Sequence, residues 1–143
     1  MIVSQILKAK GSDVATIAPD ARVADAAARL ANGRIGALVV SGGGGAIAGI
    51  ISERDIVRAL AVAGATALDS RVETLMSRNV ATCAPADSLE SLMREMTARR
   101  VRHLPVVKEG RLAGIVSIGD VVKHRLDELE RERAMLVSYV ASG

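Results

Sequence analysis

In this 143-residue chain, the residues best placed to do chemistry are two pairs with the spacing Ser-x-x-Asp. Ser52 is followed three residues later by Asp55, and Ser117 by Asp120. Each pair comes directly after a run of Gly and β-branched residues, a pattern that predicts the end of a strand and the start of a helix. At such a junction the two side chains can form a capping box, in which each accepts from a free backbone N–H group.

The same residue types also suit a nucleoside phosphate. A helix N-terminus offers an anion its free N–H groups and the positive end of the helix dipole. A hydroxyl can donate to a phosphate, and an Asp carboxylate can accept two hydrogen bonds from the vicinal diol of a ribose. The Gly three residues before each Ser would let another backbone or a flat ring approach closely. Taken singly, the motif favours capping over ligand binding by roughly two to one.

Both motifs lie in an internal repeat that covers most of the chain. Residues 16–40 align with 82–107 at an offset of 66, and residues 48–57 align with 113–122 at an offset of 65 after one loop deletion. Each copy predicts a strand, a helix, two strands joined by a hairpin loop, and a helix that begins just after the Ser. The predicted strands are 14–17, 36–40, 46–51, 80–83, 103–107 and 111–116. The predicted helices before the last are 2–9, 22–32, 71–76 and 88–98.

The repeat predicts an α/β protein built as a tandem, pseudo-twofold pair. Two copies of about 60 residues cannot hold comfortable separate cores, so we expect them to pack on each other. We expect repeat 1 at 1–64, a linker at 65–71, repeat 2 at 72–127 and an extended C-terminal helix at 128–143. In the last helix, predicted from 118 to 140, apolar residues fall at heptad spacing, with Arg133 interrupting the stripe. This pattern fits a dimer helix and an amphipathic helix lying on its own domain equally well.

Composition narrows the class of protein. Half of the residues are hydrophobic, which argues against wholesale disorder. The chain has no Trp or Phe and one Tyr, so it offers almost no rings for stacking single-stranded nucleic acid. The lone Cys83 rules out an internal disulfide and fits a reducing compartment. The N-terminus does not resemble a secretory signal and no apolar run is long enough to span a bilayer, so we expect a cytoplasmic protein.

The paired G-h-h-S-x-x-D motifs, the T-x-A-P openings at 16–19 and 82–85, and the run RHLPVV closely resemble cystathionine-β-synthase-type (CBS) domains in tandem, the Bateman module. The resemblance covers nearly the whole chain. It implies a β-α-β-β-α unit in each copy and two clefts between the copies. It implies binding of an adenosine derivative such as AMP, ADP, ATP, NAD(H) or S-adenosylmethionine. It also implies that the Asp of one copy faces the first and second strands of the other.

Transferred to this sequence, the resemblance implies the residues of two clefts. The first cleft would contain Ser52, Arg54, Asp55, Thr82, Cys83, Val101, Arg102, His103 and Pro105. The second would contain Ser117, Gly119, Asp120, Thr16, Ile17, Ile35, Gly36 and Ala37. In the first cleft, Asp55 would hold the ribose, and Arg102 and His103 would lie near the phosphate. Cys83 and Val101 would line the base.

The two clefts differ in charge at matching positions. Gly119, Gly36 and Ala37 stand in the second cleft where Arg54, Arg102 and His103 stand in the first. We therefore expect weak phosphate binding in the second cleft and more room for a bulky ligand. Neither histidine combines with Cys83 at a metal-ligand spacing, so no metal site is expected.

The leading interpretation is a non-catalytic adenine-nucleotide sensor that signals through a homodimer or to an effector protein. A constitutive interaction or scaffold protein with vestigial clefts is the alternative. A nucleotide-hydrolysing enzyme comes third, because the sequence offers no metal cluster and no paired general acid and base, and no catalytic cofactor is expected. The segment GGGAIA at 43–48 loosely matches a dinucleotide-binding loop, but a strand follows it rather than a helix, so it is interpreted as a hairpin loop. A membrane or nucleic-acid partner is not expected.

Overall fold

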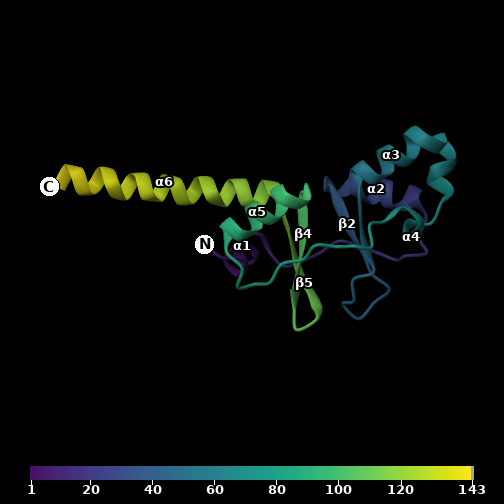
Figure 1. Cartoon of the computed structure of the whole chain (residues 1–143), viewed down its shortest axis with the longest axis horizontal. Helices are drawn as coiled ribbons and strands as arrows, with labels where there is room; N and C mark the ends of the chain where they lie inside the picture. Colours follow the sequence, from purple (N-terminus) through teal and green to yellow (C-terminus); the bar gives the residue numbers. More distant parts are fainter. Residues whose placement is uncertain (143) are drawn as a thin grey trace.

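The computed structural model describes residues 1–142 and shows two lobes, each built around its own small sheet (Figure 1). In the first lobe, β1 (Thr16–Ile17), β2 (Ala37–Val40) and β3 (Gly49–Ser52) form a sheet in that order, with β1 parallel and β3 antiparallel to β2. In the second lobe, β4 (His103–Lys108) and β5 (Arg111–Ser117) pair antiparallel. The predicted α/β class and the repeated element order are confirmed.

The helices follow the same repeat. The first lobe carries α2 (Val23–Gly33) and α3 (Glu53–Ala63), and the second carries α5 (Leu89–Arg99) and the long α6 (Ile118–Ser142). Two short helices, α1 (Val3–Lys10) and α4 (Val72–Leu75), precede the copies, and a 3-10 turn at Gly64–Asp69 joins them. In Figure 1, α2, α3, α5 and α6 lie along the upper side of the two sheets, and the β4–β5 hairpin turn lies at the lower side.

The predicted strand at 80–83 is reduced to a single parallel bridge between Cys83 and Val106. In the first lobe, the Val39 N–H donates to the Ala15 carbonyl at 3.2 Å and extends the pairing of β1 with β2. Pro105 occupies the position that matches Val39, and proline has no N–H to donate. The second copy of this pairing is therefore shorter than the sequence pattern predicts.

Each lobe completes its core with a short helix from the other copy. Val3 and Ile6 of α1 are fully buried against the second sheet, in one cluster with Leu104 and Val116. Val72 of α4 is likewise buried in the first lobe, with Met76 just after it. The copies are therefore not side-by-side blocks in space, because each preceding helix crosses to the opposite sheet.

The last helix begins on the second lobe and then leaves it. Only Val121 and His124 of α6 are buried among its described residues. Figure 1 shows the remainder projecting away from both lobes, and Leu136 is 66% exposed and Val140 76% exposed. The predicted helix is confirmed, but the interpretation in which it lies along its own domain is wrong for this outer part. No helix within residues 1–142 is both long and apolar enough to cross a membrane.

Candidate ligand-binding clefts

Both Ser-x-x-Asp motifs form the capping box that their spacing predicts. The Ser52 N–H donates to Asp55 Oδ2 at 2.8 Å, and the Asp55 N–H donates to Ser52 Oγ at 3.3 Å. The matching bonds at the start of α6 join Ser117 N–H to Asp120 Oδ2 at 2.9 Å and Asp120 N–H to Ser117 Oγ at 3.2 Å. Capping therefore fixes the position of each carboxylate at a helix N-terminus, whatever else it binds.

The Gly three residues before each Ser accommodates the crossing segment of the other copy. A Cβ placed on Gly49 would lie 2.6 Å from Met76 Sδ and 2.6 Å from the Ser77 carbonyl oxygen. A Cβ placed on Gly114 would lie 2.7 Å from Leu7 Cδ2. The close approach expected from the sequence is thus made by the protein's own chain, and it is what lets α1 and α4 seat on the opposite sheets.

A first cavity of about 210 Å³ opens between the two copies. It brings together six of the predicted residues of the first cleft, three from each copy: Ser52, Arg54, Asp55, Val101, Arg102 and His103. It is also lined by Gly36, which was assigned to the second cleft, and by five residues that were assigned to neither cleft: Ile50, Glu53, Arg58, Ser77 and Arg100. Four arginines and two carboxylates therefore line this cavity, which gives it a basic character.

Three residues assigned to the first cleft do not line this cavity. Cys83 and Pro105 are buried, because Cys83 pairs with β4 at Val106 and faces the core of the second lobe. Thr82 is exposed. Burial first, and then the neighbouring Asp87 carboxylate, raise the pKa of the Cys83 thiol to about 12, so the thiol is uncharged at neutral pH. The expectation that Cys83 lines the base is not met by this position.

Arg100 is a residue that the repeat itself could have indicated. It ends α5 in the left-handed conformation with a φ of 54°, and Arg34 ends α2 with a φ of 52°. The two are identical residues at matching positions, and a left-handed φ is uncommon for a residue other than Gly. Arg100 lies on the first cavity and Arg34 on the second. The same left-handed backbone conformation in both copies thus places one arginine at each cleft.

A second cavity of about 650 Å³ is also lined by residues of both copies, and it shares Gly36 and His103 with the first. Of the predicted second-cleft residues it brings together Ser117, Ile35, Gly36 and Ala37. Thr16, Ile17, Gly119 and Asp120 are not part of its lining: Ile17 is buried in the first core, and the Thr16 carbonyl accepts from Arg29.

The second cavity is not without cations, contrary to the comparison of matching positions. Lys10 and Arg34 both line it, with Asp13 as the accompanying carboxylate. Lys10 lies before the aligned repeat begins, so no matching position could have indicated it. The charge difference between the clefts is therefore smaller than the sequence predicts, although the first cavity still has more basic side chains.

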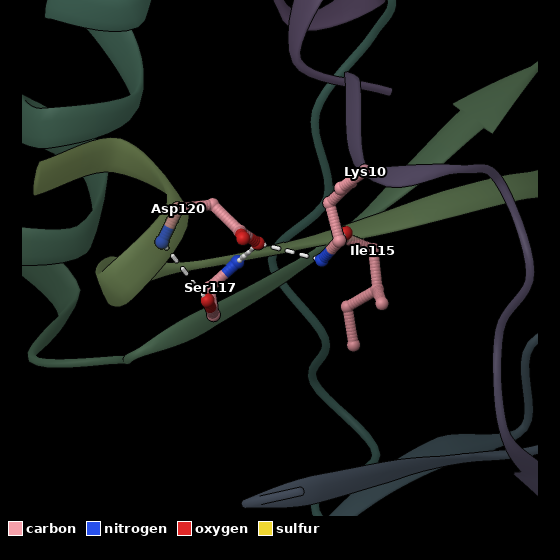
Figure 2. Close-up of polar contacts among 4 residues, drawn as sticks. All are labelled: Lys10, Ile115, Ser117 and Asp120. Atoms are coloured by element: carbon pink, nitrogen blue, oxygen red, sulfur yellow. Dashed lines mark hydrogen bonds and ion pairs between the residues drawn. The ribbon is translucent and has the colours of Figure 1, made fainter. Parts of the chain in front are cut away.

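Lys10 forms an ion pair with the carboxylate of the second motif (Figure 2). Its Nζ lies 2.6 Å from Asp120 Oδ2 and donates to the Ile115 carbonyl oxygen at 2.9 Å. Burial raises the pKa of Asp120. The hydrogen bonds from Lys10 and Ser117, together with the lysine charge, lower the pKa by a larger amount, so it lies below its ordinary value. Asp120 is therefore ionised at neutral pH.

His103 lies on both cavities. Its imidazole packs on Gly36, where a Cβ would lie 3.0 Å from His103 Cε1. Burial lowers the pKa of His103, and this outweighs the opposing effect of the Glu53 carboxylate. The imidazole is therefore neutral at neutral pH, which limits the help it gives to an anion without first gaining a proton.

No group of three or more His, Cys, Asp or Glu side chains gathers as metal ligands within residues 1–142.

The sequence pattern of the CBS domain family matches residues 3–62 and again residues 72–127. A mitochondrial CBS domain-containing protein of Arabidopsis thaliana is 34% identical over 149 residues, which cover 99% of this chain and 72% of that protein. The crystal structure of a CBS-domain-containing protein from Agrobacterium tumefaciens is 46% identical, with a TM-score of 0.85 over 87% of this chain and 99% of that one.

Two solved structures with the same fold contain adenosine-derived ligands. A CBS domain protein from Pyrobaculum aerophilum, complexed with AMP, is 26% identical with a TM-score of 0.73 over 84% of this chain and 89% of that one. A CBS domain pair in complex with 5′-methylthioadenosine and S-adenosyl-L-methionine is 26% identical with a TM-score of 0.80, over 90% of this chain and 98% of that one.

Proposed function

Because the chain belongs to the CBS domain family, we propose that it is a non-catalytic sensor of an adenine nucleotide (AMP, ADP, ATP or NAD(H)) that passes its ligand state to a dimer partner or an effector protein. CBS domains are generally regulatory, non-catalytic modules, and no catalytic family is indicated. Neighbouring structures that bind AMP, S-adenosylmethionine or methylthioadenosine support an adenosine-derived ligand.

The first cavity carries this proposal. One oxygen of Asp55, Oδ2, is held by the Ser52 N–H and by the Ser52 hydroxyl at 3.0 Å. The other oxygen receives no hydrogen bond from residues 1–142 and is available to a ribose hydroxyl. Arg102 approaches from the opposite copy, and three further arginines line the same cavity, which suits a phosphate. Ile50 and Val101 give the apolar surface that a base requires.

Calorimetric titration of AMP and ADP into wild type and three variants tests the assignment. We expect two binding phases and assign the tighter one to the first cavity. Arg102→Ala should weaken this tighter phase by about ten- to a hundredfold, since it removes a charge-assisted hydrogen bond. Asp55→Ala should remove that phase. Asp120→Ala is the matched control, because it deletes the same capping interaction from the other motif, and it should keep the phase. Loss of the phase in Asp120→Ala alone would show that the cleft assignment is wrong.

The alternative, a scaffold with vestigial clefts, predicts a different result in a simpler measurement. A ligand present at about 100 times its dissociation constant and bound only by the folded state stabilises it by about 2.7 kcal/mol, and so raises the melting temperature. If AMP, ADP, ATP, NADH and S-adenosylmethionine all leave the melting temperature unchanged, the scaffold function replaces the sensor.

We also propose that the signal passes through a homodimer in which the outer part of α6 takes part. Leu136 and Val140 are apolar, highly exposed and on the heptad stripe. Sedimentation velocity should show a dimer for the full chain, and Leu136→Glu should shift it toward monomer. Ser138→Glu adds the same charge on the opposite face of α6 and should keep the dimer. A wild type that sediments only as a 14.9 kDa species at micromolar concentration would exclude the dimer.

A cytoplasmic location completes the proposal, because the single cysteine is buried and free, as is usual in a reducing compartment.

A further inference from the structure

The two Ser-x-x-Asp motifs present different groups to their cavities. Asp55 is part of the lining of the first cavity, so a carboxylate faces the ligand space there. Asp120 is not part of the lining of the second cavity, whereas Lys10 and Ser117 are. Figure 2 shows Lys10 reaching the Asp120 carboxylate from a separate part of the chain. The charged residue that lines the second cavity beside this motif is thus Lys10, which is ion-paired with the carboxylate.

The hydrogen bonds around each carboxylate explain this difference. In the first motif the Ser52 hydroxyl donates to Asp55 Oδ2. In the second motif Lys10 donates to Asp120 Oδ2, and the Ser117 hydroxyl accepts from the Asp120 N–H. Among residues 1–142, the lysine is a partner that the second carboxylate has in addition to its capping box. Ser117 lines the cavity, and because a hydroxyl proton can rotate, its hydroxyl can donate to a ligand there.

Lys10 also keeps one hydrogen-bond donor in reserve. An ammonium group has three N–H donors, and the structure uses two of them, to Asp120 and to the Ile115 carbonyl oxygen. The side chain is only 29% exposed, so it is held in place rather than extended into solvent. The remaining donor is directed by these two bonds, and Arg34 adds a second cation on the same cavity.

We propose that Lys10, together with Ser117, recognises an anionic group, a phosphate or a carboxylate, in the second cavity. The first cavity selects its ligand through a ribose diol at Asp55, whereas the second selects through the anion at Lys10. This inference deepens the proposed function and rests on it for the nucleotide as ligand. The recognition of an anion by Lys10 is testable without a nucleotide.

Methyl-resolved NMR titration of the full chain separates the two cavities. Ile35, Ala37 and Ile115 line the second cavity, and Ile50 and Val101 line the first. The ligands are AMP, adenosine and inorganic phosphate. Wild type should prefer AMP over adenosine at the second cavity, and Lys10→Met should reduce that preference by about ten- to a hundredfold. Lys10→Arg, which keeps the charge, should retain most of the preference.

Lys8→Met is the control for charge and for the helix. Lys8 lies on the same helix, carries the same charge and is exposed away from the cavity lining, so the AMP preference should persist. If Lys10 only ties α1 to α6, Lys10→Met will lower stability and leave the ratio of AMP to adenosine affinity unchanged. That unchanged ratio would overturn the proposal.

Titration with adenine compounds and titration with inorganic phosphate distinguish failure of this proposal from failure of the proposed function. If no adenine compound shifts either set of methyl groups, the nucleotide sensor fails. Inorganic phosphate then decides the role of Lys10: shifts at the second cavity that Lys8→Met keeps and Lys10→Met loses would support it. Absence of those shifts in wild type would refute it.

Discussion

The two glycines that precede the capping boxes lead to a sharp stability prediction. Gly49→Ala and Gly114→Ala make the same chemical change at matching positions of the repeat, and neither glycine has the positive φ that would disfavour alanine. Without a close neighbour, such a change would stabilise the chain by about 0.4–1 kcal/mol. Any destabilisation therefore reports the contact with the crossing segment of the other copy.

The contacts predict that the two variants lose different amounts of stability. The three atoms nearest to a Cβ at Gly114 all belong to the Leu7 side chain, which can rotate away. The Cβ at Gly49 would also meet the Ser77 carbonyl oxygen, and that backbone is bonded to Ile50 by two hydrogen bonds of 3.0 and 2.9 Å. Overpacking typically costs about 1–3 kcal/mol. We expect about 1 kcal/mol of lost stability for Gly114→Ala and about 3 kcal/mol or more for Gly49→Ala.

Urea denaturation of single and double variants measures these effects. Adding Leu7→Ala to Gly114→Ala should cost less than the sum of the single changes, because it removes the atoms that clash. Adding Met76→Ala to Gly49→Ala should leave most of the destabilisation, because the Ser77 carbonyl oxygen remains. Equal tolerance of the two glycine variants, or full relief of Gly49→Ala by Met76→Ala, would refute this account of the crossing.

Two further predictions follow from titratable groups. Burial holds the pKa of His103 below its ordinary value, so the unfolded chain takes up the proton first as pH falls, and stability is lost on going from neutral pH down through the ordinary histidine range. His103→Gln should flatten this loss when urea midpoints are compared at about pH 7.5 and 5.5, and equal losses in both proteins would contradict it. With its raised pKa and burial, the Cys83 thiol should react with a disulfide reagent only as fast as the chain opens. Labelling that is complete in the native protein before urea-induced unfolding would disagree.

The sequence predicts the local features of this fold well, because the same pattern of residues occurs at matching positions of both copies. The capping boxes at Ser52 and Ser117 depend only on residues three apart, and both are present. The strand at 80–83 is overestimated, because the pattern of apolar residues does not register that Pro105 lacks an N–H donor.

The cleft linings are harder to predict, since they depend on how the two copies meet. Arg102 and His103 follow from the family resemblance and lie on the first cavity, but Cys83 faces the core instead. Lys10 could not be deduced from the repeat, because it precedes the aligned segment and reaches Asp120 only after α1 has crossed to the second sheet.

The exchange of α1 and α4 between the lobes leaves no position at which the chain can be divided into two self-sufficient halves. A break within 64–70 would leave the first fragment without Val72 and the second without Val3 and Ile6, all of which are completely buried. Each fragment would also carry a short helix, α1 or α4, that packs against the sheet of the other fragment. Two such fragments are expected to fold only as a complementing pair, each supplying the buried helix that the other lacks.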